Sequence, residues 1–128
     1  MVERHTTGPL AAGHAAERIA RIRLERSGLE FVHSNYNCRF GELDLIMRDR
    51  HALVVIEVRY RSRTVVMHPA DSVTSAKMQR IARATRHFLQ AHPRWRNVPV
   101  RFDVVGLHGS IAHPEMNWIR GAFTIDDI

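Results

Sequence analysis

The chain has 128 residues, the usual length of one domain, so a second independent core is not expected. Its composition of 45% hydrophobic and 25% charged residues is typical of globular proteins and excludes collagen-like, low-complexity and fully disordered chains. Nineteen lysines and arginines against thirteen acidic residues give a formal net charge of +6. This charge is typical of proteins that bind a polyanion, either nucleic acid or an anionic membrane. A solvated basic surface without a partner is an equally weighted alternative.

The single cysteine, Cys38, allows neither an internal disulfide nor a thiolate metal site and favours a reducing, intracellular setting. The stretch from Met1 to Gly8 lacks the apolar core of a signal peptide, and no window reaches the roughly 18 consecutive apolar residues of a membrane span. We therefore expect a cytoplasmic protein with no membrane partner. Residues 1–9 are expected to form a flexible lead-in to a single domain over residues 10–128.

The first predicted element is an amphipathic helix over residues 10–27, where apolar residues recur at steps of three and four. Gly28 follows at the position of a helix C-cap. Three runs rich in Val, Ile, Leu and aromatic residues, separated by polar turns, then predict consecutive strands. These strands cover residues 30–36, 42–47 and 52–60.

A second helix is predicted between Thr74, a candidate N-cap, and Pro93. A fourth strand follows over residues 98–107, and residues 111–123 are expected to be an irregular tail with at most a short strand around Trp118. The sequence therefore predicts an α/β domain with a mixed central sheet flanked by helices, in the order α-β-β-β-α-β.

Two acidic residues interrupt strands that otherwise read as buried. Glu57 follows the apolar run of residues 53–56, and Asp44 lies within residues 43–47. An ionised carboxylate in such a strand costs several kcal/mol unless it is paired, hydrogen-bonded or bound to a metal. A hairpin loop centred on residues 50–51 would place Asp44 directly opposite Glu57, on the same face of the sheet.

A pair of facing carboxylates repels when dry but can hold a divalent cation, and a small set of oxygen ligands suits Mg²⁺ or Mn²⁺. Arg59 lies two residues beyond Glu57 and shares its face, where it could clamp a phosphate. The alternative is a buried ion pair of Arg59 with Glu57 or Asp44 and no metal.

Other patterns are weaker. No histidine pair has the spacing of a helical zinc site, and phosphate-cradling glycine loops are absent from the sequence. Arg101 and Asp103 alternate onto one face of the fourth strand, which predicts a structural ion pair. Trp95, Trp118 and Phe123 are expected to pack in the core or dock the tail rather than stack on bases.

Several segments together resemble the YraN-type uncharacterised family, which is related to archaeal Holliday junction resolvases within the PD-(D/E)xK nuclease superfamily. The resemblance covers roughly residues 10 to 123. It rests on the residues and intervals of the following segments: Glu17, Asn35–Ile46, Ile56–Arg61, Val73–Thr74 with Lys77, and Arg101–Val105. The resemblance implies a restriction-endonuclease-like core and a metal-dependent endonuclease that hydrolyses phosphodiester bonds in DNA, including branched or structured DNA.

The resemblance assigns Asp44 and Glu57 as metal-binding acids, with the backbone carbonyl of Val58 as a further ligand. It also matches Glu17 to a glutamate on the first helix of the family, where the superfamily often supplies another metal ligand. For Glu17 the alternative is a surface charge paired with Arg21 at i, i+4.

The superfamily motif has lysine where this chain has Arg59. Arginine stays protonated, so it can orient water or stabilise charge but cannot act as a base. Lys77, the only lysine in the chain, matches a lysine of the family pattern and could serve as a displaced catalytic lysine or bind a phosphate. Its alternative is a solvated helix residue.

We expect Arg39, Arg61, Arg63, Lys77 and Arg80 to contact nucleic acid, most simply the phosphates of DNA, although each could be an ordinary solvated residue. A homodimer is a further expectation, because junction-cutting relatives act as dimers. Two other functions stay open: a catalytically inactive nucleic-acid-binding module of the same fold, and a protein-interaction domain.

Overall fold

The computed structural model describes residues 9–63 and 73–124 and confirms the predicted α/β class. Its helices are α1 (Pro9–Arg26) and α2 (Ser75–Ala91), followed by a short 3-10 helix η3 (Pro93–Trp95). Its strands are β1 (Glu30–Cys38), β2 (Gly41–Asp49), β3 (Ala52–Arg61), β4 (Val100–His108) and β5 (Glu115–Phe123). This arrangement is consistent with a restriction-endonuclease-like fold.

One predicted segment needs correction, and another lies almost wholly outside the described residues. Of the expected lead-in over residues 1–9, residues 1–8 lie outside the described residues, while Pro9 already begins α1. The expected irregular tail over residues 111–123 contains a full strand, β5, which pairs antiparallel with β4 from Glu115 to Phe123. The sequence of β5 includes Asn117, Arg120 and Gly121, so it lacks the alternation typical of a strand. Its strand structure therefore depends on pairing with β4.

The five strands form one mixed sheet in the order β1-β2-β3-β4-β5. Strands β1, β2 and β3 form an antiparallel meander, β3 and β4 are parallel, and β5 returns antiparallel. The parallel step needs a long crossover, and α2 lies within it. The sheet is therefore continuous, with β1 and β5 at its edges.

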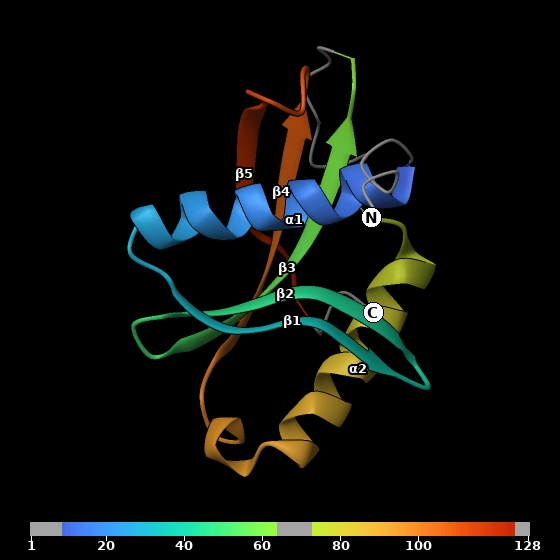
Figure 1. Cartoon of the computed structure of the whole chain (residues 1–128). Coiled ribbons are helices and arrows are strands. Elements are labelled where there is room, and N and C mark those ends of the chain that lie inside the picture. Colours follow the sequence, from blue (N-terminus) through green and yellow to red (C-terminus); the bar gives the residue numbers. More distant parts are fainter. Residues whose placement is uncertain (1–8, 64–72, 125–128) are drawn as a thin grey trace, which may run out of the picture.

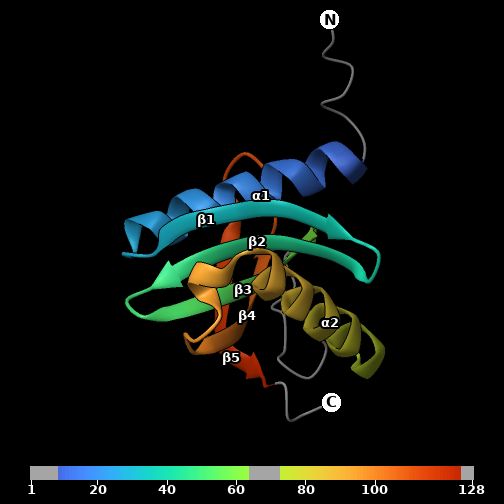
Figure 2. The ribbon, with the colours of Figure 1, turned by 90° about the horizontal axis from the view of Figure 1, so that it is seen from below.

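The helices lie on opposite sides of the curved β1–β2 hairpin, as Figures 1 and 2 show. Two hydrophobic clusters follow from this arrangement. One contains Ile81 and Phe88 of α2 with sheet residues such as Val55, and the other contains Ala20 and Leu24 of α1 with sheet residues such as Ile56. Alternate residues of β3 thus face different helices, which explains its uninterrupted apolar run.

Local capping signals fix both helices. Gly28, with φ +105°, ends α1 as predicted, since its N–H donates to Glu25 O and the N–H of Leu29 donates to Leu24 O. At α2, the hydroxyl of Thr74 accepts a hydrogen bond from the backbone N–H of Lys77 at 3.2 Å, which confirms Thr74 as the N-cap. No helix among the described residues is long and apolar enough to cross a membrane.

Candidate active site

The hairpin of β2 and β3 has the register that the sequence predicts. Paired residues run from Asp49↔Ala52 to Leu45↔Ile56, with Arg50 at φ +59° in the two-residue loop. The next step of this ladder brings Asp44 opposite Glu57. Here the backbone N–H of Val58 donates to Oδ2 of Asp44 at 3.0 Å. The Asp44 side chain thus accepts a hydrogen bond from β3 just beyond the last paired residues, Leu45 and Ile56.

Glu57 is buried at the end of the apolar run of β3, with 7% of its surface exposed. Its Oε2 lies 2.6 Å from the ammonium nitrogen of Lys77 and 4.0 Å from Nε of Arg59. The Lys77 pair is short enough for a charge-assisted hydrogen bond, whereas Arg59 is too distant for one. The partner that a buried glutamate requires is therefore Lys77 more than Arg59.

Lys77 reaches this position because the start of α2 is fixed by the Thr74 cap, in which the backbone of Lys77 itself takes part. The lysine side chain is 38% exposed, so it connects the buried carboxylate to the surface. Arg59 is held more deeply, and its Nε is buried without a hydrogen-bond partner among the described residues. The site thus has one paired cation and one buried cation with unused donor capacity.

Asp44 shows the strongest electrostatic perturbation in the site. Burial, followed by the negative charge of Glu57, raises the pKa of the Asp44 carboxyl to about 8, and the hydrogen bond from Val58 opposes this shift only in part. The charge of Glu17 adds a smaller increase. Asp44 and Glu57 therefore interact strongly, and the two cations beside them, Lys77 and Arg59, lie against Glu57.

Glu17 enters the same electrostatic cluster from α1. Burial raises its pKa, as do the charges of Glu42 and Glu57, whereas His14 and a hydrogen bond with the Asn35 side chain lower it. Its Oε1 atom is buried without a hydrogen-bond partner. An unused carboxylate oxygen in a buried position has capacity for a further ligand.

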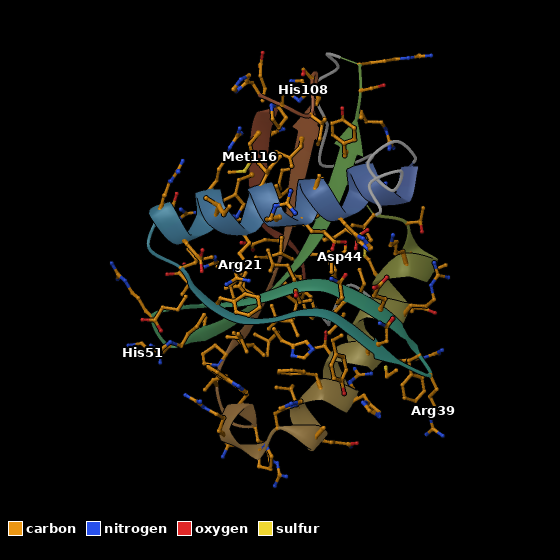
Figure 3. All side chains as sticks on the ribbon, viewed as in Figure 1. Arg21, Arg39, Asp44, His51, His108 and Met116 are labelled. Carbon is orange, nitrogen blue, oxygen red and sulfur yellow. The ribbon has the colours of Figure 1, made fainter. Side chains whose placement is uncertain are left out.

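The alternative interpretation of Glu17 as the surface partner of Arg21 is wrong. Nε of Arg21 instead pairs with Glu25 at 3.5 Å, and its guanidinium lies 3.7 Å from the centre of the Phe31 ring. Figure 3 shows Arg21 and Asp44 at different positions below α1. The sequence analysis placed Asn35 in a family segment but gave it no role. In the structure it has a φ of 52°, a conformation that asparagine adopts more readily than most residues, and its side chain bonds to Glu17.

The donor set fits a hard divalent cation. In the described part of the chain, no three His, Cys, Asp or Glu side chains converge as a complete ligand group, so the assignment of Glu17 as a ligand stays a prediction. Mg²⁺, however, is commonly held by only one or two carboxylates, with waters and substrate phosphates completing its shell. Asp44 and Glu57 would supply such a pair, and the charge of a bound cation would oppose the burial and the negative charge of Glu57 that raise the pKa of Asp44.

The predicted nucleic-acid contacts fall on two sides of this site. Arg39 lies in the β1–β2 turn, where Figure 3 shows it at the tip of the hairpin, and its guanidinium lies over the ring of Phe40. Arg80 of α2 packs near the same turn. A Cβ atom added to Gly41 would lie 3.8 Å from the Cβ of Arg80. Arg61 and Arg63 are exposed at and after the end of β3.

Another carboxylate near the site has a structural role. Asp103 is fully buried and paired with Arg101, whose Nε and Nη2 lie 2.9 and 3.0 Å from its two oxygens. Its remaining capacity is used by the indole N–H of Trp118 and the backbone N–H of Gly121, each at 2.9 Å. The predicted ion pair is thus confirmed, and Trp118 docks β5 onto it.

Comparisons with known proteins agree with this reading of the motifs. Residues 16–107 match the family described as Uncharacterised protein family UPF0102. A UPF0102 protein of Stutzerimonas stutzeri is 43% identical over 88% of this chain and 94% of its own length. Similar relatives occur in Nitrosococcus oceani, with 43% identity over 89% and 92%, and in Xanthomonas euvesicatoria, with 47% over 90% and 93%. With the matched segment spanning both Asp44 and Glu57, the chain belongs to the UPF0102 family, also called the YraN family.

Proposed function

We propose that this protein is a metal-dependent endonuclease that hydrolyses phosphodiester bonds in DNA, including branched or otherwise structured DNA. The observation that carries the proposal is the half-buried Asp44 of β2 beside the buried Glu57 of β3, with the ammonium of Lys77 2.6 Å from Glu57 and the pKa of Asp44 raised. An acid with a raised pKa beside a second acid and a cation is typical of catalytic sites, although structural ion pairs can resemble them.

Asp44 and Glu57 would hold Mg²⁺ or Mn²⁺, with the backbone carbonyl of Val58 as an additional ligand. When bound, the cation supplies Lewis-acid polarisation of the scissile phosphate and lowers the pKa of a bound water. The chain itself contributes the fixed negative charge that attracts the cation. Glu17, with its unpartnered Oε1, offers one more oxygen at the α1 side of the cluster.

Lys77 takes the role of the motif lysine in this proposal. Its ammonium arrives from the first turn of α2, whereas the motif position on β3 is occupied by Arg59. Lys77 can orient a water or release a proton at Nζ once the charge of Glu57 is engaged elsewhere. Arg59 stays charged and stabilises negative charge that develops on a phosphate oxygen.

The charge of the chain supports DNA as the polyanion. The formal net charge is +6, and the exposed arginines at positions 39, 61, 63 and 80 lie on elements that border the acidic pair. Contacts of this kind position the phosphate backbone without reading the sequence, and their strength falls steeply with salt. We therefore expect structure-selective rather than sequence-selective binding.

The test is cleavage of labelled single-stranded, duplex, flapped and four-way-junction DNA with Mg²⁺ or Mn²⁺. Glu57→Ala removes the central carboxylate, and Glu25→Ala is the matched control, because Glu25 is an exposed glutamate of α1 that pairs with Arg21. We expect metal-dependent cleavage by the unaltered protein and by Glu25→Ala, and a loss of at least about a hundredfold in Glu57→Ala, the scale of removing one electrostatic group from a transition state.

The outcomes separate this proposal from its alternatives. Salt-dependent DNA binding that survives Glu57→Ala, with no cleavage under either metal, would identify an inactive binding module. Absence of DNA binding at low salt would instead favour a protein-interaction domain. A calorimetric titration with Mn²⁺ adds a readout that does not depend on activity: binding should be present in the unaltered protein and lost in Glu57→Ala.

A further inference from the structure

A cleft lies at the end of α2 that is remote from Lys77. It encloses about 330 Å³ between β1, the end of β2, the last turn of α2 and η3. This volume lies within the roughly 300–1,000 Å³ of small-molecule sites. We call it the aromatic cleft and define it by six of its lining residues: His33, Arg48, Phe88, His92, Arg94 and Trp95.

The walls of the aromatic cleft are rings. The ring of His92 stacks on Phe88 with centroids 4.1 Å apart, and His33 lies 6.2 and 6.5 Å from these two rings. The indole of Trp95 closes another side and is itself buried. Flat rings with an open neighbouring volume are the surfaces on which nucleobases stack.

The rim of the cleft is cationic. The exposed guanidinium of Arg94 lies 4.7 Å from the centre of the Trp95 ring. Arg48 of β2 pairs with Glu30 of the neighbouring strand β1. Glu30 is exposed and is the one acidic residue among those that line the cleft. Arg94 is therefore ready to contact an anion, while Glu30 partly neutralises Arg48.

The cleft and the acidic pair are joined by a basic surface on α2. Lys77 and His92 are separated by most of the helix, about 22 Å at 1.5 Å per residue. Arg80, Arg83 and Arg86 are exposed between them. One strand of B-form DNA carries a phosphate about every 3.4 Å along the helix axis, so a stacked strand that follows α2 would cover the distance in about six nucleotides and an extended strand in fewer.

We infer that the aromatic cleft binds an unpaired nucleobase of a single-stranded segment of DNA, while Arg94 contacts its phosphate and the arginines of α2 guide the strand toward Asp44 and Glu57. This inference rests on the proposed function and narrows it to substrates with a single-stranded part. The faces of bases inside a duplex are covered by their neighbours, so only an unpaired base can stack in the cleft.

The test measures binding in EDTA, so that cleavage does not interfere, by fluorescence anisotropy of a labelled twelve-nucleotide thymidine oligomer and of a duplex of equal length. Arg94→Glu alters the cleft. Arg120→Glu is the matched control, because Arg120 is an exposed arginine over the ring of Trp118 on β5, at the opposite edge of the sheet. Both variants change the net charge equally.

Arg94→Glu should weaken binding of the single strand at least about fivefold more than Arg120→Glu does, while the two variants should affect the duplex alike. Glu30→Gln should tighten single-strand binding, because it removes the rim carboxylate and releases Arg48. His92→Ala, checked for folding by thermal unfolding, should weaken only single-strand binding.

Two different failures are distinguishable. If Arg94→Glu and Arg120→Glu lower single-strand binding equally and Glu30→Gln has no effect, the cleft does not hold a base, whereas the nuclease proposal stands on its cleavage test. If the unaltered protein binds neither single strand nor duplex at low salt, the proposed function fails and this inference fails with it.

Discussion

Two carboxylates of the sheet, the buried Asp103 and the half-buried Asp44, have opposite surroundings. Asp103 of β4 pairs in register with Ile56, the residue before Glu57. Both oxygens of Asp103 receive two hydrogen bonds each, from Arg101, Trp118 and Gly121. Asp44 of β2 receives a hydrogen bond from the backbone N–H of Val58 and shares another with the side chain of Glu57, and burial together with the charge of Glu57 raises its pKa to about 8.

Under the proposed function, this difference separates a structural acid from a metal-binding one. A buried carboxylate whose lone pairs are all used contributes to a unique packing arrangement and has no capacity for a ligand. Around Glu57 the hydrogen bonds are incomplete, because Oε1 of Glu17 and Nε of Arg59 both lack a hydrogen-bond partner. Such incomplete pairing is costly to folding and is retained where a ligand completes it.

The largest expected effect is on stability and tests the role of the Asp103 network. Arg101→Met should lower the free energy of unfolding by about 3 kcal/mol, because it leaves Asp103 buried without its cation, and the partial exposure of Arg101 keeps the loss at the lower end for such pairs. Arg96→Met, at an exposed arginine after η3, should change it by less than about 0.5 kcal/mol. Urea unfolding measures both, and equal stabilities would show that the Asp103 network is dispensable.

The second prediction concerns the pH dependence created by Asp44. Between its ordinary pKa of 3.8 and the folded value of about 8, the folded protein keeps a proton that the unfolded chain has lost. The stability contributed by this group is therefore complete below pH 3.8 and falls as pH rises, by about 1.4 kcal/mol per unit. Relative to Asp44→Asn, the metal-free protein should lose about 2–3 kcal/mol between pH 5 and 7.

Unfolding in urea with EDTA at pH 5, 6 and 7 measures this difference, and parallel curves for the two proteins would contradict the raised pKa. Added Mn²⁺ provides a second arm. Metal binding requires the deprotonated carboxylate, so Mn²⁺ should stabilise the unaltered protein more as pH rises and should release a proton on binding. Asp44→Asn should show neither response.

The carboxylate pair could be predicted from the sequence because its causes are local. The position of the polar loop sets the register of a hairpin, and the register alone brings Asp44 opposite Glu57. The same holds for Gly28 and Thr74, which end and begin helices through neighbours in the chain. These predictions depended on spacing within a few residues.

The remaining features depend on contacts between distant segments. No spacing rule brings Lys77 to Glu57, because that contact is set by how α2 packs on the sheet. The strand character of β5 likewise depends on Trp118 and Gly121 reaching Asp103. The alternation of β4 predicted the pair of Arg101 and Asp103, but the third partner, Asp49, comes from the β2–β3 turn and could not be predicted.

A smaller effect is expected from removing the cation of the pair itself. Lys77→Met should lower the free energy of unfolding by about 1 kcal/mol, since Glu57 loses its short ion pair but the exposure of Lys77 limits what that pair contributes. Adding Glu57→Gln in the same chain should recover most of this loss. If the double variant is no more stable than Lys77→Met, the two residues are not coupled, and a double-mutant cycle measures this directly.

The smallest effect distinguishes the two cations of the site. Arg59→Lys introduces the residue of the superfamily motif, but Lys77 already supplies an ammonium to Glu57, whereas Nε of Arg59 stays 4.0 Å away. We therefore expect a change of less than about 0.5 kcal/mol in stability, the usual scale for a substitution that breaks no hydrogen bond. Metal-dependent cleavage should stay within about threefold, less than about 0.7 kcal/mol of barrier. A tenfold gain would instead show that β3 is the proper place of the catalytic lysine, and Lys77→Met in the Arg59→Lys background would then leave cleavage intact.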